Sequence, residues 1–268
     1  MKLDILDTTK KKTGEIDLPK QFDEDIRQDL VSRAVLALQS SKILPYGATP
    51  EAGKRSSANL SKRRRKYRGM YGFGISRTPR KVLSRRGTRM YWVGAVSPNT
   101  IGGRRAHPPK SEKKFVKKIN KKERKLAIRA GISATVVSDL VKKRGHIVPE
   151  NYPFILDKKF EDLSKTREVM QSLNAFGLSK ELERVDKKII RSGKGKHRGR
   201  KYKTKKGPLI VVSKQGKIMK AADNIPGIEI INVKNLNASV LAPGEVPGRL
   251  TLWTTGAIET LEKEKLFR

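Results

Sequence analysis

The sequence contains no cysteine. This absence excludes disulfides, thiolate zinc sites, iron–sulfur clusters and cysteine nucleophiles. No apolar run approaches the roughly 18 residues of a membrane span, and the N-terminus has no hydrophobic signal segment. We therefore expect a soluble, cytoplasmic chain that has no membrane partner.

Acidic residues are also scarce. The 268 residues include 26 Asp and Glu against 62 Lys and Arg, which gives a net charge of +36, and the hydrophobic share is only 36%. The sequence pI is about 10.5 and the mean hydropathy is −0.61. The length suffices for a domain with a real core, and the charge predicts a polyanionic partner, so the favoured class is a nucleic-acid-binding protein.

The positive charge is concentrated in two segments. Residues 52–111 contain 17 Lys and Arg and no acid, and residues 187–206 contain 11 Lys and Arg and no acid. Together they carry +28 of the net +36. The rest of the chain therefore resembles an ordinary globular domain that bears two polycationic segments.

The N-terminal part predicts a hairpin and two helices. Apolar and polar residues alternate over 3–7 and 15–18, around a turn at 11–14. A helix is expected over 22–38, with Asp23, Glu24 and Asp25 at the positive end of its dipole. A second helix is expected from Asn120, which stands three residues before Glu123 in the spacing of a capping box.

The remaining part predicts short apolar strands separated by helices. The strands are expected at 153–156, 209–212, 228–233 and 250–253, and helices at 164–176 and from Ser179 towards Ile190. Such continuous apolar strands are typical of a parallel sheet that is covered on both faces. We predict an α/β fold, a three-layer α/β/α domain formed by residues 1–44 and 112–268, with a mostly parallel sheet of about four strands.

Residues 45–111 lack both the helical and the strand period, and Gly and Pro recur throughout. Such a segment cannot bury enough apolar area to offset a chain entropy of roughly 1–2 kcal/mol per residue. A structureless insertion of this length is usually functional or disordered. We predict an extended basic loop that inserts into RNA, and a solvated loop without function is the alternative.

The residue types in this loop favour RNA. Arginine binds phosphate through two donors, and aromatic or guanidinium planes stack on unpaired bases. Trp92 has a second interpretation, as part of a small apolar cluster with Val93 and Val96. The predicted RNA-binding residues of the loop are Lys62, Arg63, Arg64, Arg65, Lys66, Arg68, Tyr71, Arg77, Arg80, Arg85, Arg86, Arg89, Trp92, Arg104, Arg105, His107 and Lys110.

The second basic segment interleaves glycine with cations over 192–203. It matches neither G-x-x-x-x-G-K-[ST] nor G-x-G-x-x-G, so we predict contacts to several phosphates and no nucleotide site. The alternative is a solvated tail. The predicted RNA-binding residues here are Lys194, Lys196, His197, Arg198, Arg200, Lys201, Tyr202 and Lys203.

Catalysis has little support in the sequence. His107, His146 and His197 lie far apart, without metal-ligand spacing or a neighbouring carboxylate pattern. We predict no enzyme, no cofactor, no metal site and no small-molecule substrate. A nucleic-acid-modifying enzyme and an architectural DNA-binding protein are the alternatives from other classes.

Several blocks, in order along nearly the whole chain, resemble the L-four family of large-subunit ribosomal proteins, in its archaeal and eukaryotic branch. They are Glu15–Pro19, Gly102–Lys110 with the helix Ile119–Arg129, the glycine–lysine run 193–202, Leu241–Gly244 and Pro247–Thr254. The chain lacks the long C-terminal extension of the eukaryotic members, so an archaeal type is expected.

This resemblance implies a structural component of the large ribosomal subunit that binds 23S-type rRNA and supports subunit assembly. It also implies that the basic loop helps to line the polypeptide exit tunnel, near the ribosomal protein L-twenty-two. The residues that the resemblance places nearest the tunnel are Gly72, Phe73, Gly74, Arg77, Arg80 and Gly87.

Overall fold

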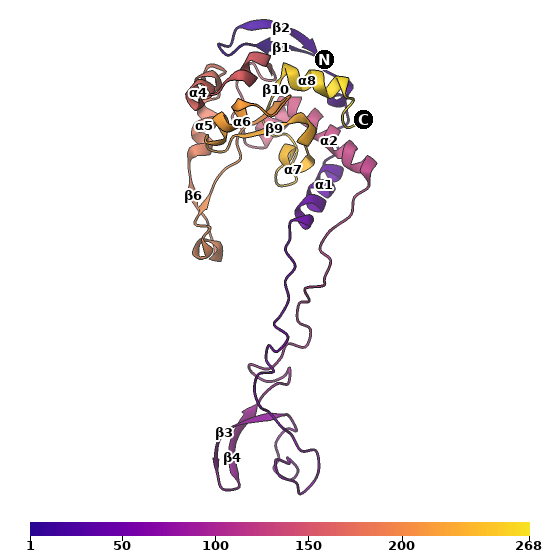
Figure 1. The fold of residues 1–268 in the computed structure, drawn as a ribbon, viewed down its shortest axis with the longest axis vertical. Helices are drawn as coiled ribbons and strands as arrows, with labels where there is room; N and C mark the ends of the chain where they lie inside the picture. Colours follow the sequence, from indigo (N-terminus) through magenta and orange to yellow (C-terminus); the bar gives the residue numbers. More distant parts are fainter. The chain divides into compact units, whose positions relative to one another are not determined.

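The computed structural model describes residues 1–268, and the chain divides into two units, each with its own hydrogen-bonded strands (Figure 1). The sheet unit comprises Met1–Lys42 and Val116–Arg268. The insertion unit comprises Ile43–Phe115.

The sheet unit is built on six strands in the order β2-β1-β5-β10-β8-β9. All neighbouring pairs are parallel except β1 with β2. The strand bounds are β1 Lys2–Leu6, β2 Lys12–Asp17, β5 Ile155–Leu156, β8 Leu209–Val212, β9 Glu229–Asn232 and β10 Thr251–Thr254. The predicted α/β class with a mostly parallel sheet is confirmed. The expected number of about four strands is wrong, because the N-terminal hairpin joins the sheet through the pairing of β1 with β5.

Helices cover both faces of this sheet. Leu209 and Val211 of β8 pack into a core cluster with α1, α2 and α8, whereas Ile210 and Val212 pack into a second cluster with α4 and α6. The helices are α1 Gln28–Ser41, α2 Lys121–Val136, α3 Ser138–Lys143, α4 Thr166–Ala175, α5 Ser179–Asp186, α6 Lys217–Asp223, α7 Ala238–Leu241 and α8 Thr255–Lys263. Because successive residues of a strand face opposite sides, all four residues of β8 are apolar and buried. None of the helices combines the length and the hydrophobicity that crossing a bilayer requires.

The helix boundaries agree with the sequence where a cap marks them. Asn120 is the N-cap of α2, and α4 ends just before Gly177, whose φ of +86° suits glycine. The expected capping-box bond is absent, since the Asn120 side chain makes no cap hydrogen bond and Glu123 pairs with Arg33 at 3.5 Å.

Two helix predictions need correction. The helix expected over 22–38 begins only at Gln28, because Glu24, one of the acidic residues expected at its start, is held by α2 instead. Glu24 pairs with Arg129 at 2.6 Å, and its backbone N–H donates to Ser133. The helix expected from Ser179 towards Ile190 ends at Asp186. Ile189–Ile190 form the short strand β6, which pairs with β7, Tyr202–Lys203.

Candidate nucleic-acid interface

The insertion unit contains a hairpin that the sequence analysis did not predict. Strands β3 (Arg80–Arg86) and β4 (Arg89–Gly94) pair antiparallel around a turn at Gly87, whose φ is +59° (Figure 1). The expectation of a structureless segment is therefore wrong for residues 80–94. The strand period was not visible because neither strand has one fully buried face, so apolar and basic residues do not alternate cleanly.

The charges of the insertion unit have no partners of opposite sign. It contains 19 Lys and Arg but only two acids, Glu51 and Glu112. No ion pair of the structure involves any residue of the unit. Its buried hydrophobic residues are only Met70 and Ala95. The unit therefore offers an unneutralised cationic surface on very little core.

Arginines of the unit stack on its aromatic rings. Arg64 and Arg77 lie over the Tyr71 ring, at 5.6 and 4.9 Å from its centroid. The Arg77 guanidinium also donates to the Tyr71 hydroxyl at 3.1 Å. Such exposed cation–π pairs contribute about 0.5–1 kcal/mol each, so a stacking base could replace either partner at small cost.

A second aromatic group joins the basic run 62–68 to the hairpin. Arg68 and Arg85 lie over the Tyr67 ring, at 5.6 and 5.5 Å. A pocket of about 360 Å³ beside them is lined by Tyr67, Phe73 and Trp92 together with cations. The structure thus gathers predicted RNA-binding residues that are up to 26 positions apart in the sequence, such as Lys66 and Trp92.

Arg80 makes more hydrogen bonds within the unit than the other predicted arginines, such as Arg77 and Arg85, which make one each. Its guanidinium bonds the Ser76 carbonyl at 2.6 Å and the Ser76 hydroxyl at 3.1 Å, and it lies over the Trp92 ring at 5.8 Å. Val93, the expected partner of Trp92 in an apolar cluster, is 42% exposed. Trp92 therefore packs on Arg80 rather than in a cluster with Val93.

The two ends of the insertion unit run side by side. Tyr46 stacks on Phe115 at 5.7 Å between ring centroids, and the Ala48 N–H donates to the Pro109 carbonyl at 3.1 Å. A cleft of about 820 Å³ is lined here by Tyr46 and by residues 105–110, so it includes Arg105, His107 and Lys110.

Four of the six residues expected near the tunnel lie in open parts of the unit, whereas Arg80 is half-buried and bonded to Ser76, and Arg77 lies over the Tyr71 ring. Gly72, Gly74 and Gly87 have φ of +82°, +64° and +59°, and no other group lies within 4 Å of where a Cβ would stand. Phe73 is 71% exposed. Glycine suits these positions because other residues rarely adopt a positive φ.

Residues 187–206 of the sheet unit form what we call the basic hairpin. Its strands β6 and β7 are joined by the 3₁₀ turn Lys194–Arg198, between Gly193 and Gly199, which have φ of +79° and +75°. The Arg191 N–H donates to the Lys201 carbonyl at 2.8 Å. Of its 11 cations only Lys206 has a carboxylate partner, Glu229. The segment is a hydrogen-bonded hairpin rather than an irregular tail, and its contacts with RNA stay a prediction.

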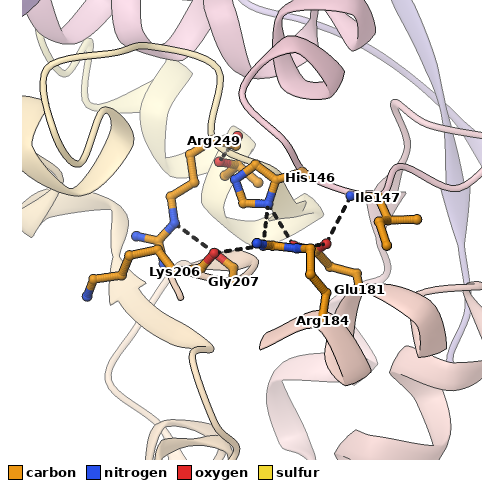
Figure 2. A network of polar contacts seen from close by, with 8 residues as sticks. His146, Ile147, Glu181, Arg184, Lys206, Gly207 and Arg249 are labelled. Carbon is orange, nitrogen blue, oxygen red and sulfur yellow. Dashed lines mark hydrogen bonds and ion pairs between the residues drawn. The ribbon is translucent and has the colours of Figure 1, made fainter. Parts of the chain in front are cut away.

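The root of the basic hairpin, where Lys206 contacts α5 of the sheet unit, is held in place by a buried carboxylate. Glu181 is 0% exposed and receives hydrogen bonds from His146 Nδ1 at 2.7 Å, from the Ile147 N–H at 2.9 Å and from two nitrogens of Arg184, both at 2.7 Å (Figure 2). Arg184 also donates to the Lys206 carbonyl at 2.9 Å. Burial raises the pKa of Glu181, but the hydrogen bonds from Arg184, His146 and Ile147 outweigh it and hold the pKa below its ordinary value.

A second buried charge holds the end of the basic hairpin. Arg249 is 0% exposed, donates to the Gly207 carbonyl at 3.0 Å (Figure 2) and pairs with Glu229 at 2.6 Å. Burial lowers the pKa of Arg249, and the hydrogen bond and charge of Glu229 oppose that shift. Glu229 therefore connects Arg249 with Lys206, the last residue of the basic hairpin.

Sequence reasoning missed these anchoring residues. The sequence shows no carboxylate pattern near His146, but folding brings Glu181, 35 positions away, into contact with its ring. No local pattern marks Glu181 or Arg249, because a buried charge looks in the sequence like any surface charge.

The predicted RNA-binding side chains are exposed, apart from Arg68, Arg80 and Trp92, which are half-buried. They form two groups, one in each unit, and their contacts with RNA stay a prediction.

Comparisons with known proteins agree with the resemblance found in the sequence. Residues 16–264 match the model of the ribosomal protein L4/L1 family. The chain is 51% identical over 268 residues to the large ribosomal subunit protein uL4 of Nanoarchaeum equitans, and both chains are covered completely. It is 43% identical over 259 residues to that of Methanococcoides burtonii, with 96% of each chain covered, and 41% identical over 263 residues to that of Archaeoglobus fulgidus, with 97% of this chain and 98% of the relative covered.

Proposed function

The chain belongs to the ribosomal protein L4/L1 family, and from that premise we propose that it is a structural component of the large ribosomal subunit that holds folded rRNA through its insertion unit and its basic hairpin. The prediction that the chain is not an enzyme is confirmed by the family, whose members described above are named as ribosomal proteins. The suggested archaeal type agrees with the archaeal source of these relatives.

The observation that carries the proposal is the uncompensated charge of the insertion unit. Its 19 cations have no ion pair within the protein, so a polyanion is the partner that would neutralise them. Each cation that neutralises an RNA phosphate releases condensed counterions, and log affinity then falls by roughly 0.7 per contact for each log unit of salt. Counterion release gives affinity without an enclosed pocket, so an exposed cationic surface is sufficient for binding.

The small core of the insertion unit suggests that RNA binding and folding are coupled. Ordering the backbone costs roughly 1–2 kcal/mol per residue. Of the two buried apolar side chains, Met70 contributes about 1.5–3 kcal/mol and Ala95 about 0.8 kcal/mol. We infer that rRNA contacts supply the remaining stabilisation, so the unit becomes ordered as it embeds in RNA.

The finer part of the proposal concerns the exit tunnel. We propose that the segment around Gly72–Gly74 and the turn at Gly87 lie near the tunnel lumen, next to the ribosomal protein L-twenty-two. The exposure of Phe73 and the open space around the three glycines support this placement, since such residues can lie at a wall without steric conflict.

Sedimentation tests the central part. A tagged copy of the chain is expected to sediment with large subunits and to crosslink to rRNA through both basic segments. Recovery of the chain only in particle-free fractions would contradict the proposal.

The absence of native cysteine allows a direct test of the tunnel placement. A crosslinker on Phe73→Cys is expected to capture nascent chains in stalled ribosomes, whereas one on Ser164→Cys, an exposed position of the sheet unit, is expected to capture none. Equal capture from both positions, or none from Phe73→Cys in assembled ribosomes, would contradict the tunnel placement and leave rRNA binding intact.

A further inference from the structure

A cleft of about 1010 Å³ lies at the root of the basic hairpin, within the sheet unit. One wall is formed by residues 189–192 and 203–206 of the hairpin, and the other by the end of α3 with the loop 243–246. We propose that this cleft binds the sugar–phosphate backbone of rRNA, as a site distinct from the turn of the hairpin. The inference rests on the proposed function and assigns RNA contacts to Lys143, Arg144, Arg191 and Lys205, which lie outside the predicted set, beside Lys203, which belongs to it.

The first argument is charge. Seven Lys and Arg residues line the cleft and no Asp or Glu does. Arg184 pairs with Glu181 and Lys206 pairs with Glu229, and neither acid lines the cleft. The five lining cations that have no carboxylate partner are Lys143, Arg144, Arg191, Lys203 and Lys205.

Arg144 is a half-buried cation of the cleft that has no carboxylate partner. Its guanidinium donates to the carbonyls of Pro243 and Val246, which fixes the loop, but no carboxylate balances its charge. Burial and the nearby charge of Arg249 lower the pKa of Arg144 to about 10. A bound phosphate would supply the missing negative charge.

The second argument is the kind of side chain that lines the cleft. No Phe, Tyr or Trp lines the cleft, and its one aromatic ring, His146, is buried and bonded to Glu181, so no exposed aromatic platform is available for a base to stack on. Its apolar lining consists of aliphatic residues such as Ile189, Ile190 and Val246, which are 51%, 61% and 44% exposed. Aliphatic patches among cations suit ribose and phosphate, and five free cations suit several phosphates.

The third argument is preorganisation. The buried carboxylate of Glu181 holds Arg184 and His146, and Arg184 holds the Lys206 carbonyl, so one cleft wall is tied to α5 (Figure 2). The other wall is held by the hydrogen bonds from Arg144 to the carbonyls of Pro243 and Val246. A ligand that enters a fixed cleft loses less affinity to the ordering of side chains and loops.

Salt-dependent binding tests the cleft. The double variant Lys143→Ala/Lys205→Ala removes two free cations, and Lys158→Ala/Lys159→Ala is a matched control, because both control lysines are exposed and unpaired and lie outside the cleft. With a large-subunit rRNA fragment in 0.15 M salt, each lost contact is expected to lower affinity roughly fourfold to fivefold, so the cleft variant binds about 20-fold more weakly. Its salt slope is expected to fall by about 1.4–1.8, while the control stays within twofold of the parent chain.

Equal affinity of the cleft variant and the control would overturn the inference. The proposed function would still stand if the parent chain binds the fragment, and it would fail separately if the parent chain does not bind rRNA.

Directed cleavage locates the RNA. A hydroxyl-radical source on Thr204→Cys, which lines the cleft, is expected to cut one short rRNA stretch, and the cuts are expected to disappear in the Lys143→Ala/Lys205→Ala background. Persistence of the cuts in that background would contradict the inference. Displacement of the stretch by ATP at concentrations that leave the rest of the complex bound would also overturn it, since the cleft would then be a nucleotide site.

Discussion

The buried carboxylate at the root of the basic hairpin yields the sharpest prediction on stability. Glu181→Gln keeps the size of the side chain but removes a charge that accepts hydrogen bonds from Arg184, His146 and the Ile147 N–H. Removing one partner of a buried ion pair costs about 3–5 kcal/mol. Since the Arg184 side chain is 19% exposed and can turn partly to water, we expect the lower end, a loss of about 3 kcal/mol in the free energy of unfolding.

Urea unfolding followed by tryptophan fluorescence measures this loss. Trp253 lies in the core at 4% exposure, and Trp92→Phe makes it the only reporter. The matched control is Glu259→Gln, because Glu259 pairs with Lys263 on the surface at 3.2 Å and such pairs contribute about 0.3–0.5 kcal/mol. A loss below about 1 kcal/mol for Glu181→Gln would refute the reasoning that the carboxylate anchors this region.

The pH dependence of the same difference has a definite sign. The pKa of Glu181 is below its ordinary value of 4.5 in the folded protein, because its hydrogen bonds outweigh the effect of burial. The stabilisation is therefore complete above that ordinary value and disappears as the pH falls through the folded pKa. The difference between the parent chain and Glu181→Gln is expected to shrink only on acidification below about pH 4.5. A difference that stays constant to lower pH would contradict the assignment.

Of three further predictions, two concern the insertion unit, and the third concerns the close contact of Gly227 with Val185. Replacing Arg63, Arg64 and Arg65 by Ala should lower the salt slope of rRNA binding by about 2 without changing the unfolding of the sheet unit, and an unchanged slope in filter binding would exclude these residues as phosphate contacts. Deletion of residues 56–104 should leave a folded sheet unit that binds rRNA through the basic hairpin but enters large subunits poorly in reconstitution, and normal assembly would count against the insertion unit. Gly227→Ala should lower the free energy of unfolding by about 2 kcal/mol or more in urea titration, because Gly227 has a φ of +71° and a Cβ would overlap Val185 Cγ1, and a neutral effect would refute that packing.

The regular part of the fold could be predicted because its cause is local. The continuous apolar run Leu209–Val212 is needed wherever helices cover both faces of a strand, and Gly177 ends α4 at the predicted place. The start of α1 could not be predicted, since Glu24 is held by Arg129 from another helix. Partners more than 100 residues apart leave no trace in a local pattern.

The candidate interface also has a part that could be predicted from the sequence and a part that could not. Its cations and aromatic residues could be predicted from composition, because unneutralised charge is a property of a segment as a whole. Their grouping could not, since the stacking of Arg85 on Tyr67 depends on the β3–β4 hairpin. The anchors Glu181 and Arg249 were missed because burial, which gives them their role, is decided by tertiary packing.

Amide hydrogen exchange, measured on the full chain with and without large-subunit rRNA, tests the central claim most directly. Residues 56–104 are expected to exchange rapidly in the free protein, and both this segment and the basic hairpin are expected to become strongly protected when rRNA is added, while the core strands β8 and β10 are protected throughout. Strong protection of 56–104 in the absence of RNA, or no gain in either segment on its addition, would contradict the account.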